Sequence, residues 1–284
     1  MSGTQIRMRV LGGRDRPRGL ARVEPLAESS VERPMAGRQT GAAFTLIELL
    51  VVISIMMTLL SVLLPSLSRA KEIAKQVTCL TRVSAQVKAI HMYSSDQRGL
   101  IPVGPSETMT LPGGYPGPPY NSIATNQIWI GPLKTHTGLG LLLPKQHLGQ
   151  AEAVFCPDDD SADPTEELAK IQDRTGEDVY CSYLYRQLDC RDAASAGRCH
   201  IDNLGCNPEG KRVRAVVLDM NSKMQIPGMP VRTNHRAKRV SVGFAEGHCK
   251  IYDNPDDAMT LRNGDEMRMF DRLDEVLQYA DALD

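Results

Sequence analysis

The sequence has almost no net charge and contains none of the short motifs that mark common enzyme classes. Its 284 residues include 33 lysines and arginines against 34 aspartates and glutamates, a formal net charge of −1. Such a balance offers no overall attraction to nucleic acid or to an anionic lipid surface. We find no G-x-S-x-G, no H-E-x-x-H, no P-loop and no Rossmann fingerprint. The sequence therefore disfavours an enzyme and predicts no nucleic-acid partner.

The near-zero total hides an uneven distribution of charge. Residues 1–43 contain eight arginines and four acidic residues, a net charge of +4. The segment is rich in Gly, Pro and Arg and has no apolar periodicity, which predicts a disordered leader. Met35 offers an alternative start, with the shorter leader MAGRQTGAA.

An apolar run of 21 residues follows, from Phe44 to Leu64. As a helix it would be about 31 Å long, the thickness of a bilayer's hydrocarbon core. The arginines before it predict a cytoplasmic N-terminus and a single pass through the membrane. A secretory signal peptide would have a shorter apolar core with small residues after it, whereas here the run is longer and the small residues precede it.

Glu48 is the one charged residue in this run. At the bilayer centre a carboxylate would cost about 2.5–3.5 kcal/mol, so its presence needs a reason. One reading is that Glu48 reaches the headgroup layer from near the helix end. The other is that it neutralises a positive charge on a neighbouring chain.

The order FTLIELLVVI resembles the N-terminal segment of the type IV pilin and type II secretion pseudopilin superfamily. In that family a prepilin peptidase cuts before the Phe and methylates the new amino group, and the mature subunit joins a filament. The resemblance implies cleavage between Ala43 and Phe44, although Ala43 stands where the family usually has Gly. It also implies that Glu48 pairs with the amine of a neighbouring subunit.

The resemblance further implies a location and a set of partners. The chain would sit in the inner (cytoplasmic) membrane, with its head in the periplasm or at the cell surface. Its partners would be the prepilin peptidase, membrane lipid, and other pilin or pseudopilin subunits in a homo- or hetero-oligomeric filament. The sequence leaves open whether that filament is a pilus or a secretion pseudopilus.

A second, amphipathic helical half is predicted after the apolar run. Pro65 resembles the proline at which many pilin helices bend on leaving the membrane. Beyond it, apolar residues recur at intervals of three and four, which predicts one buried helical stripe: Leu67, Ala70, Ile73, Val77, Leu80, Val83, Val87 and Ile90. A plain membrane anchor followed by a coiled-coil stalk would show the same pattern.

The remaining residues predict a small antiparallel sheet and one further helix. The stretch from Leu100 to Ser122 is rich in Pro and Gly and is expected to be a surface loop. Strands are expected at 127–130, 153–155, 181–185, 213–218 and 240–244, and a helix at 270–282. We therefore predict a pilin-like α+β fold with a leader (1–43), a transmembrane helix (44–64), a stalk helix (65–96) and a head (97–284).

The head resembles a large pilin-like family of planctomycete-type bacteria. That family has a Cys in the stalk helix, a Cys-Pro, a Ser-Tyr strand and a terminal His-x9-Asp-Gly-His motif. The matching residues here are Cys79, Cys156-Pro157, Ser182-Tyr183, and His235 with Glu246-Gly247-His248. Ten residues separate His235 from Glu246, and Glu replaces Asp. The resemblance implies only a structural role, in which Glu246-Gly247 forms the turn of a hairpin.

Seven cysteines are many for an exported head, and outside the cytoplasm they would tend to pair. We expect a Cys79–Cys156 disulfide, which would join the head to the stalk, and pairing within Cys190, Cys199 and Cys206. The alternative is a zinc site formed by Cys190, Cys199, His200 and Cys206, which has suitable ligand types but matches no familiar zinc-finger spacing.

Two charged clusters leave further alternatives open. The acidic run of Asp158, Asp159, Asp160 and Asp163 would suit calcium, or it forms a solvated turn that caps a helix at 165–171. The basic cluster of Arg232, His235, Arg236, Lys238 and Arg239 would suit DNA but has no interleaved aromatic residues, which favours a solvated loop.

The sequence as a whole predicts a structural pilin-like subunit with no catalytic residue. The competing hypothesis is a membrane-anchored binding or enzymatic domain outside the cytoplasm, with a Cys/His metal site, that uses the pilin segment only for targeting.

Overall fold

A computed structural model describes residues 44–110, 114–159, 161, 163–187, 200–207, 209–224, 231–265 and 268–283. The chain divides into two compact units, with the boundary after Ser54. Helix α1 (Leu46–Asp96) begins in the first unit, and every strand belongs to the second.

The first unit contains the start of α1, where Glu48 bonds to Thr45. The backbone N–H of Glu48 donates to Oγ1 of Thr45 at 3.2 Å. In return Oε2 of Glu48 accepts from the backbone N–H of Thr45 at 2.9 Å and from its hydroxyl at 2.8 Å. This reciprocal arrangement is a capping box, which satisfies N–H groups that the first turn of a helix leaves unpaired. Glu48 therefore has a local role in its own chain.

The apolar span of α1 is solvent-exposed along its whole length. Every residue from Phe44 to Leu64 is exposed. Within the described residues, α1 is the one helix that is long and apolar enough to cross a membrane by length and composition. The sequence-based prediction of a candidate transmembrane helix is confirmed to this extent.

In the second unit α1 continues through Pro65 and then becomes buried on one side. The buried side begins at Gln76 and includes Cys79, Val83, Val87 and Ile90. The predicted stripe is therefore correct from Val83 onward. It is wrong for its first part, because four of its members are exposed: Leu67, Ala70, Ile73 and Val77.

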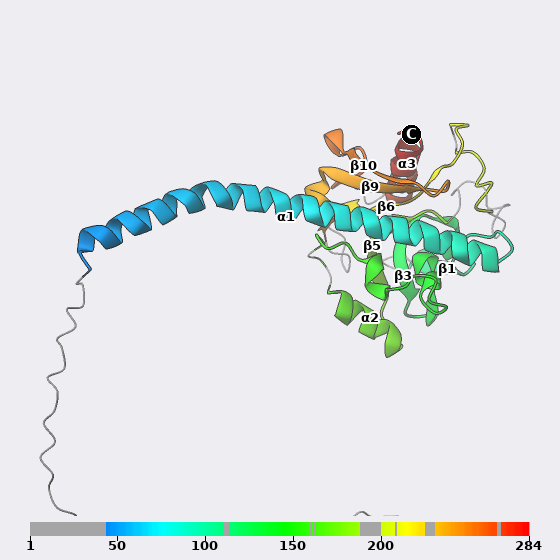
Figure 1. The fold of residues 1–284 in the computed structure, drawn as a ribbon. Coiled ribbons are helices and arrows are strands. Elements are labelled where there is room, and N and C mark those ends of the chain that lie inside the picture. Colours follow the sequence, from blue (N-terminus) through cyan, green and yellow to red (C-terminus); the bar gives the residue numbers. More distant parts are fainter. Residues whose placement is uncertain are drawn as a thin grey trace, which may run out of the picture. The chain divides into compact units, whose positions relative to one another are not determined.

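A six-stranded antiparallel sheet forms the centre of the second unit, in the order β10-β9-β6-β5-β3-β4 (Figure 1). Its strands are β3 (Thr125–Ile130), β4 (Thr135–His136), β5 (Val179–Tyr185), β6 (Ala215–Asp219), β9 (Arg239–Phe244) and β10 (Cys249–Asp253). Two small sheets pair β1 (Thr108–Thr110) with β2 (Pro116–Pro119), and β7 (Asn221–Ser222) with β8 (Arg232–Thr233).

Two further α-helices and several short 3-10 helices complete the described fold. The α-helices are α2 (Pro164–Gln172) and α3 (Met269–Asp281). The 3-10 helices are η1 (Tyr120–Ser122), η2 (Gly138–Leu142), η3 (Ala151–Val154), η5 (Asn234–Ala237) and η6 (Pro255–Asp257).

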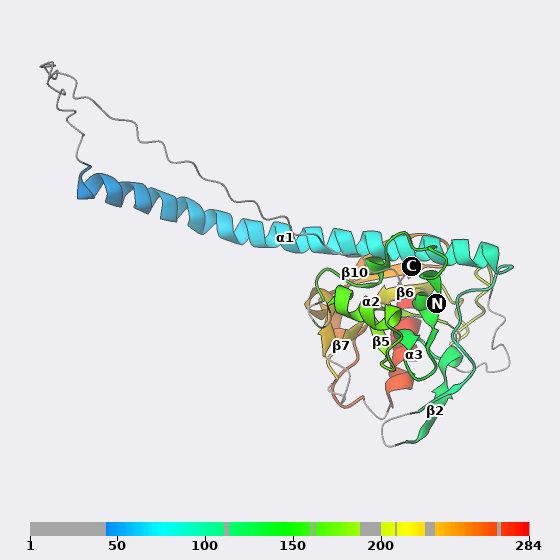
Figure 2. The same ribbon diagram turned by 90° about the horizontal axis from the view of Figure 1, so that it is seen from below.

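The sheet buries both faces, one against the second half of α1 and the other against α3 (Figures 1 and 2). The strands alternate between these faces, as their period of two requires. On β5, Tyr183 and Tyr185 join the core beneath α1, whereas Leu184 joins the core beneath α3. Residues on the α1 face of the sheet are therefore held against the stalk helix.

Helix α1 comes close to the sheet at Gly243 on β9. A Cβ atom at this position would lie 2.6 Å from Cγ2 of Val87 and 2.8 Å from Cγ1 of Val83. Only a residue without a side chain lets the helix lie so close to the strand. Gly243 thus sets the distance between the stalk helix and the sheet.

A buried ion pair joins the end of α3 to β5 and β6. Nη1 of Arg186 lies 2.9 Å from both carboxylate oxygens of Asp281, and both side chains are buried. The backbone N–H groups of Arg214 and Ala215 also donate to Oδ1 of Asp281, each at 2.9 Å. These bonds offset part of the cost of burying the two charges, while Nε and Nη2 of Arg186 are buried without a hydrogen bond among the described residues.

Most predicted elements are confirmed. The strands expected at 127–130, 181–185, 213–218 and 240–244 correspond to β3, β5, β6 and β9, and the last helix corresponds to α3. The hairpin turn at Glu246-Gly247 joins β9 to β10, where Gly247 has a φ of 98°. The strand expected at 153–155 is wrong, because the chain forms η3 there. The turn-rich stretch contains the β1–β2 pair.

Replacing Gly243 with valine is expected to push α1 away from the sheet. Overpacking of a core typically lowers the free energy of unfolding by about 1–3 kcal/mol. Thermal unfolding of the full chain in detergent, followed by circular dichroism, measures the loss. Gly176→Ala is the control, since no atom lies within 4 Å of its Cβ position. Equal melting temperatures for the Gly243 variant and the wild type would contradict this account of the close approach.

Candidate metal centre

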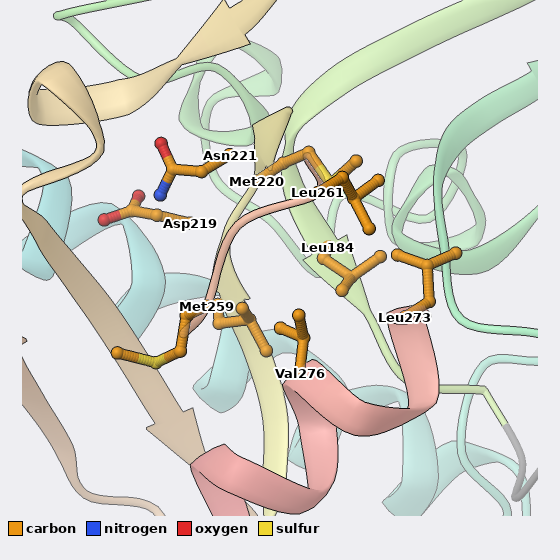
Figure 3. Close-up of a pocket in the computed structure, with 9 residues that line it drawn as sticks. Leu184, Asp219, Met220, Asn221, Met259, Leu261, Leu273 and Val276 are labelled. Carbon is orange, nitrogen blue, oxygen red and sulfur yellow. The ribbon is translucent and has the colours of Figure 1, made fainter. Parts of the chain in front are cut away.

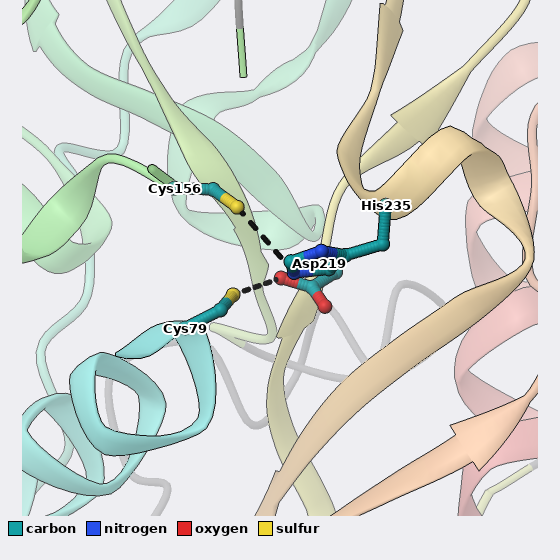
Figure 4. Close-up of side chains that lie close together, drawn as sticks. All are labelled: Cys79, Cys156, Asp219 and His235. Carbon is teal, nitrogen blue, oxygen red and sulfur yellow. Dashed lines mark hydrogen bonds between the residues drawn. The ribbon is translucent and has the colours of Figure 1, made fainter. Parts of the chain in front are cut away.

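Four chemically active side chains meet on the α1 face of the sheet: Cys79, Cys156, Asp219 and His235 (Figure 4). They come from α1, the loop after η3, the end of β6 and η5. All four residues are buried, and one potential ligand atom from each lies within 4.8 Å of those from the other three. Segments far apart in sequence therefore place two thiols, a carboxyl group and an imidazole in one cluster.

The regular elements position Cys79 and Asp219. Cys79 lies on the buried side of α1, about one turn before Val83. Asp219 is the last residue of β6, two positions after Val217, which belongs to the core beneath α1. The strand period of two turns Asp219 toward the same side. Neither side chain reaches solvent, since both residues are 0% exposed.

An unusual backbone turn presents His235. Three consecutive residues that are not glycine have left-handed backbone conformations, with φ of 49° at His235, 55° at Arg236 and 56° at Ala237. Each such residue costs roughly 1–2 kcal/mol, and strain of this kind is concentrated at functional sites. The side chain of Asn234 holds the turn in place by donating to the backbone oxygen of Ser182 at 2.7 Å.

Direct contacts link Cys79 to Asp219 and Cys156 to His235, and the two thiols also interact with each other. Sγ of Cys79 donates to Oδ1 of Asp219 at 2.9 Å, and it lies 3.2 Å from the hydroxyl of Tyr183. Sγ of Cys156 lies 3.6 Å from Nε2 of His235. Both cysteines are free thiols in the structure, so the expected Cys79–Cys156 disulfide is not formed there.

A second set of groups orients the cluster from outside. The backbone N–H of Ser241 donates to Oδ2 of Asp219 at 2.7 Å. The backbone N–H of Asp158 donates to Sγ of Cys156 at 3.4 Å. The carboxylate of Asp158, which is paired with Lys75, lies 3.6 Å from Nδ1 of His235. The surrounding chain thus supplies a hydrogen-bond donor to Asp219 and another to Cys156, and it places the Asp158 carboxylate beside the imidazole of His235.

Burial and mutual contact shift the protonation of all four groups. Burial raises the pKa of the Cys79 thiol well above its usual value, helped by Cys156 and Asp219. Burial also raises the pKa of Asp219. The hydrogen bond with Cys79 lowers the pKa of Cys156 to about 7 despite burial, with a further contribution from His235. For His235, burial opposes protonation, but Cys156 and Asp219 together raise its pKa.

We compared the chain with known proteins. No protein-family model, curated protein or solved structure matches it. What the cluster does must therefore follow from its own residues and geometry.

The donor set is the kind that zinc uses in proteins. Zinc binds thiolate sulfur, imidazole nitrogen and carboxylate oxygen, usually as a four-coordinate tetrahedron. Calcium and magnesium take oxygen ligands, so two sulfurs and an imidazole do not suit them. Cys79, Cys156, Asp219 and His235 are therefore the described residues best placed to hold a metal ion.

Sequence reasoning found three of these residues but assigned them different roles. Cys79 and Cys156 were expected to pair, and His235 was read as part of a motif and of a solvated basic loop. Asp219 was missed, although an aspartate that ends an apolar strand is an available signal. Of the residues in the alternative zinc set, Cys190 and Cys199 lie outside the described residues, whereas His200 and Cys206 are exposed. The pairing expected among Cys190, Cys199 and Cys206 therefore stays a prediction.

The acidic run serves several separate purposes where it is described. Asp158 pairs with Lys75, and Asp159 forms a buried ion pair with Arg232 at 3.1 Å. Asp163 caps α2 by accepting from the backbone N–H groups at 165 and 166, which confirms the helix-cap alternative for this residue. Asp160 lies outside the described residues. Within the described residues, Asp158, Asp159 and Asp163 do not come together as a metal-binding group.

The basic cluster divides between the interior and the surface. Arg232 and His235 are buried, whereas Arg236, Lys238 and Arg239 are exposed. The expectation of a solvated loop is thus wrong for the two buried residues, because Arg232 finds the Asp159 carboxylate and His235 finds the cysteine cluster.

On the other face of the sheet, a narrow pocket lies between the strands and α3 (Figure 3). Its walls are mainly apolar, formed by residues such as Leu184, Leu218, Leu273 and Val276. Asp219 also lines the pocket. The lining side chains leave no room for a water molecule.

Removing the Asp159 carboxylate is expected to destabilise the head more than removing that of Asp163. Asp159→Ala leaves Arg232 buried without its partner, which typically costs about 3–5 kcal/mol. Asp163→Ala loses an exposed helix cap, which costs about 0.5–2 kcal/mol. Urea unfolding of the full chain in detergent measures both, and we expect excess calcium to change neither value. A saturable stabilisation of the wild type by calcium would instead restore the calcium hypothesis.

Proposed function

We propose that this protein is a pilin-like structural subunit anchored by a single helix in the inner membrane. Prepilin peptidase would cleave it between Ala43 and Phe44 and methylate the new N-terminus. The mature chain would then join other pilin or pseudopilin subunits through its apolar helix, with its head outside the cytoplasm. Its own activity is assembly, and no residue is assigned a catalytic role.

The observation that carries this proposal is the fully exposed apolar span with one carboxylate near its start. Every residue from Phe44 to Leu64 is exposed, so the span needs lipid or other subunits to cover it. Within lipid, apolar surface alone gives no drive for association, and helices recognise each other through packing and polar contacts. Glu48 is the one ionisable side chain in the span.

The capping box leaves part of Glu48 available for a neighbour. Both bonds from Thr45 fall on Oε2, and within the described residues Oε1 accepts no hydrogen bond. After cleavage, the new amine at Phe44 of an adjacent subunit would meet this oxygen. In a medium of low dielectric constant, such a charge pair favours one register between neighbours.

The alternative hypothesis of an anchored enzyme has less support. The cluster around Cys79 is buried and is filled by four side chains, whereas a catalytic metal keeps one coordination position open for water or substrate. The metal centre therefore fits a structural role within a scaffold protein.

Replacing Glu48 separates its cap from its charge. Glutamine serves in a capping box as glutamate does, so Glu48→Gln keeps the local bonds while removing the charge. We expect Glu48→Gln and Glu48→Ala both to insert into the membrane and to be processed. Because each variant loses the charge pair with the neighbouring subunit, each should form less than about a tenth of the wild-type amount of filament. Electron microscopy of sheared filaments and immunoblotting of the mature form measure this.

Thr45→Ala is the matched control, because it removes the side-chain part of the cap and keeps the charge. It should assemble far better than either Glu48 variant. Normal filament formation by Glu48→Gln would contradict the proposed charge pair.

The mature N-terminus gives a separate test of the same proposal. We expect mass spectrometry of the protein from its native membrane to find N-methylated phenylalanine at Phe44. Co-expression of the chain with an inactive prepilin peptidase should leave residues before 44 attached. A mature chain that begins after Leu64 would instead indicate an ordinary signal peptide.

A further inference from the structure

We propose that Cys79, Cys156, Asp219 and His235 bind one structural zinc ion that joins the stalk helix to the head. The site is independent of the filament role, because none of its residues belongs to the apolar span. It is also distinct from the alternative zinc set of Cys190, Cys199, His200 and Cys206 considered from the sequence.

One distance between the side chains already matches that in a tetrahedral zinc site, and all four ligand atoms lie within 4.8 Å of one another. In a zinc site with thiolate, imidazole and carboxylate ligands, neighbouring donor atoms lie about 3.3–3.8 Å apart. The separation of Sγ of Cys156 from Nε2 of His235 is 3.6 Å. Cys79 and Asp219 are closer, at 2.9 Å, because a thiol proton bonds them. Loss of that proton to solvent, as zinc binds, would let these two atoms separate to the distance of two ligands.

The imidazole is oriented as a zinc ligand usually is. Nε2 of His235 faces Cys156, and Nδ1 faces the carboxylate of Asp158 at 3.6 Å. Among the described residues, the buried Nδ1 makes no hydrogen bond, and the Asp158 carboxylate lies just beyond hydrogen-bond distance. A carboxylate that accepts from the second nitrogen fixes the tautomer and makes the first nitrogen a better ligand. Asp158 is in turn held by Lys75.

The remaining ligands also have outer partners. The N–H groups of Ser241 and Asp158 donate to Asp219 and Cys156, and the hydroxyl of Tyr183 lies beside Sγ of Cys79. Zinc with two thiolates, one carboxylate and a neutral imidazole has a net charge of −1. These three donors would stabilise that charge in a site without solvent.

A disulfide accounts for the same residues less completely. It would use only the two sulfurs, and it would leave the carboxyl group of Asp219 and the imidazole of His235 buried beside them with no part in the bond. Burying an ionisable carboxyl group is costly unless it is paired or coordinated. A zinc ion would use all four groups. Zinc binding, unlike disulfide formation, requires no oxidant, and thiolates bound to zinc resist oxidation to a disulfide. Disulfide formation is therefore the competing state of this site.

The test is the metal content of the full chain purified in detergent without chelators, measured by plasma mass spectrometry. We expect one zinc ion per chain in the wild type and less than about a tenth of that in Cys156→Ser, His235→Ala and Asp219→Asn. Cys181→Ser is the control, because Cys181 is also buried and free but its sulfur donates to the backbone oxygen of Tyr183. It should retain zinc.

A measurement on the wild type alone guards against variants that fail to fold. Chelation under reducing conditions should lower the melting temperature, and added Zn²⁺ should restore it. Co²⁺ in place of Zn²⁺ should give the visible absorption of a tetrahedral ion together with thiolate charge transfer. A Cys79–Cys156 disulfide found by peptide mapping, a different metal at full occupancy, or no binding of either ion after reduction would overturn the proposal.

The outer carboxylate provides a finer test. Asp158→Asn should weaken zinc affinity by about 10–100-fold, as loss of such partners does in known sites. Asp163→Asn, in the same loop, should leave affinity unchanged because Asp163 caps α2. Competition with a coloured zinc chelator measures both affinities. Equal affinities for the two variants would show that His235 is not oriented in this way.

Discussion

The contact between the second half of α1 and the sheet is the constraint on which the head depends. Gly243 lets the helix approach β9 so closely that Val83 and Val87 fill the space a side chain would need. The same approach places Cys79, one turn earlier on the helix, against Asp219 of β6. Packing and cluster are therefore consequences of one geometry, and a change that moves the helix would alter both.

The interior beneath the helix contains far more ionisable groups than a small head requires for folding. Next to Cys79 lie Asp219, Cys156 and His235, and the Asp159–Arg232 ion pair is also buried. Such groups are costly to bury, and replacing them by apolar residues would often leave a protein equally stable. A shared ligand would explain why these groups are buried together and why His235 lies on a strained turn. The proposed zinc ion provides that explanation.

Features that depend on neighbouring residues could be predicted from the sequence, whereas features that depend on contacts between distant segments could not. Strand alternation and helical periodicity are local, so β3, β5, β6, β9 and α3 were predicted close to their observed bounds. The exposed part of the stalk stripe was mispredicted, because periodicity shows which side of a helix is apolar and not where its partner begins. His235 was read as solvated because its neighbours in sequence are basic. Its burial follows from a left-handed turn that no local pattern announced.

The sequence by itself determined an apolar helical span with one carboxylate near its start, an α+β head and most of its strands. These features depend on residues within a few positions of one another. Only the tertiary structure decided that residues 79, 156, 219 and 235 meet, that Asp158 pairs with Lys75 of α1, and that Asp159 pairs with the buried Arg232. The physical reason is that strand order and helix packing set distances between remote segments, and a linear pattern does not encode them.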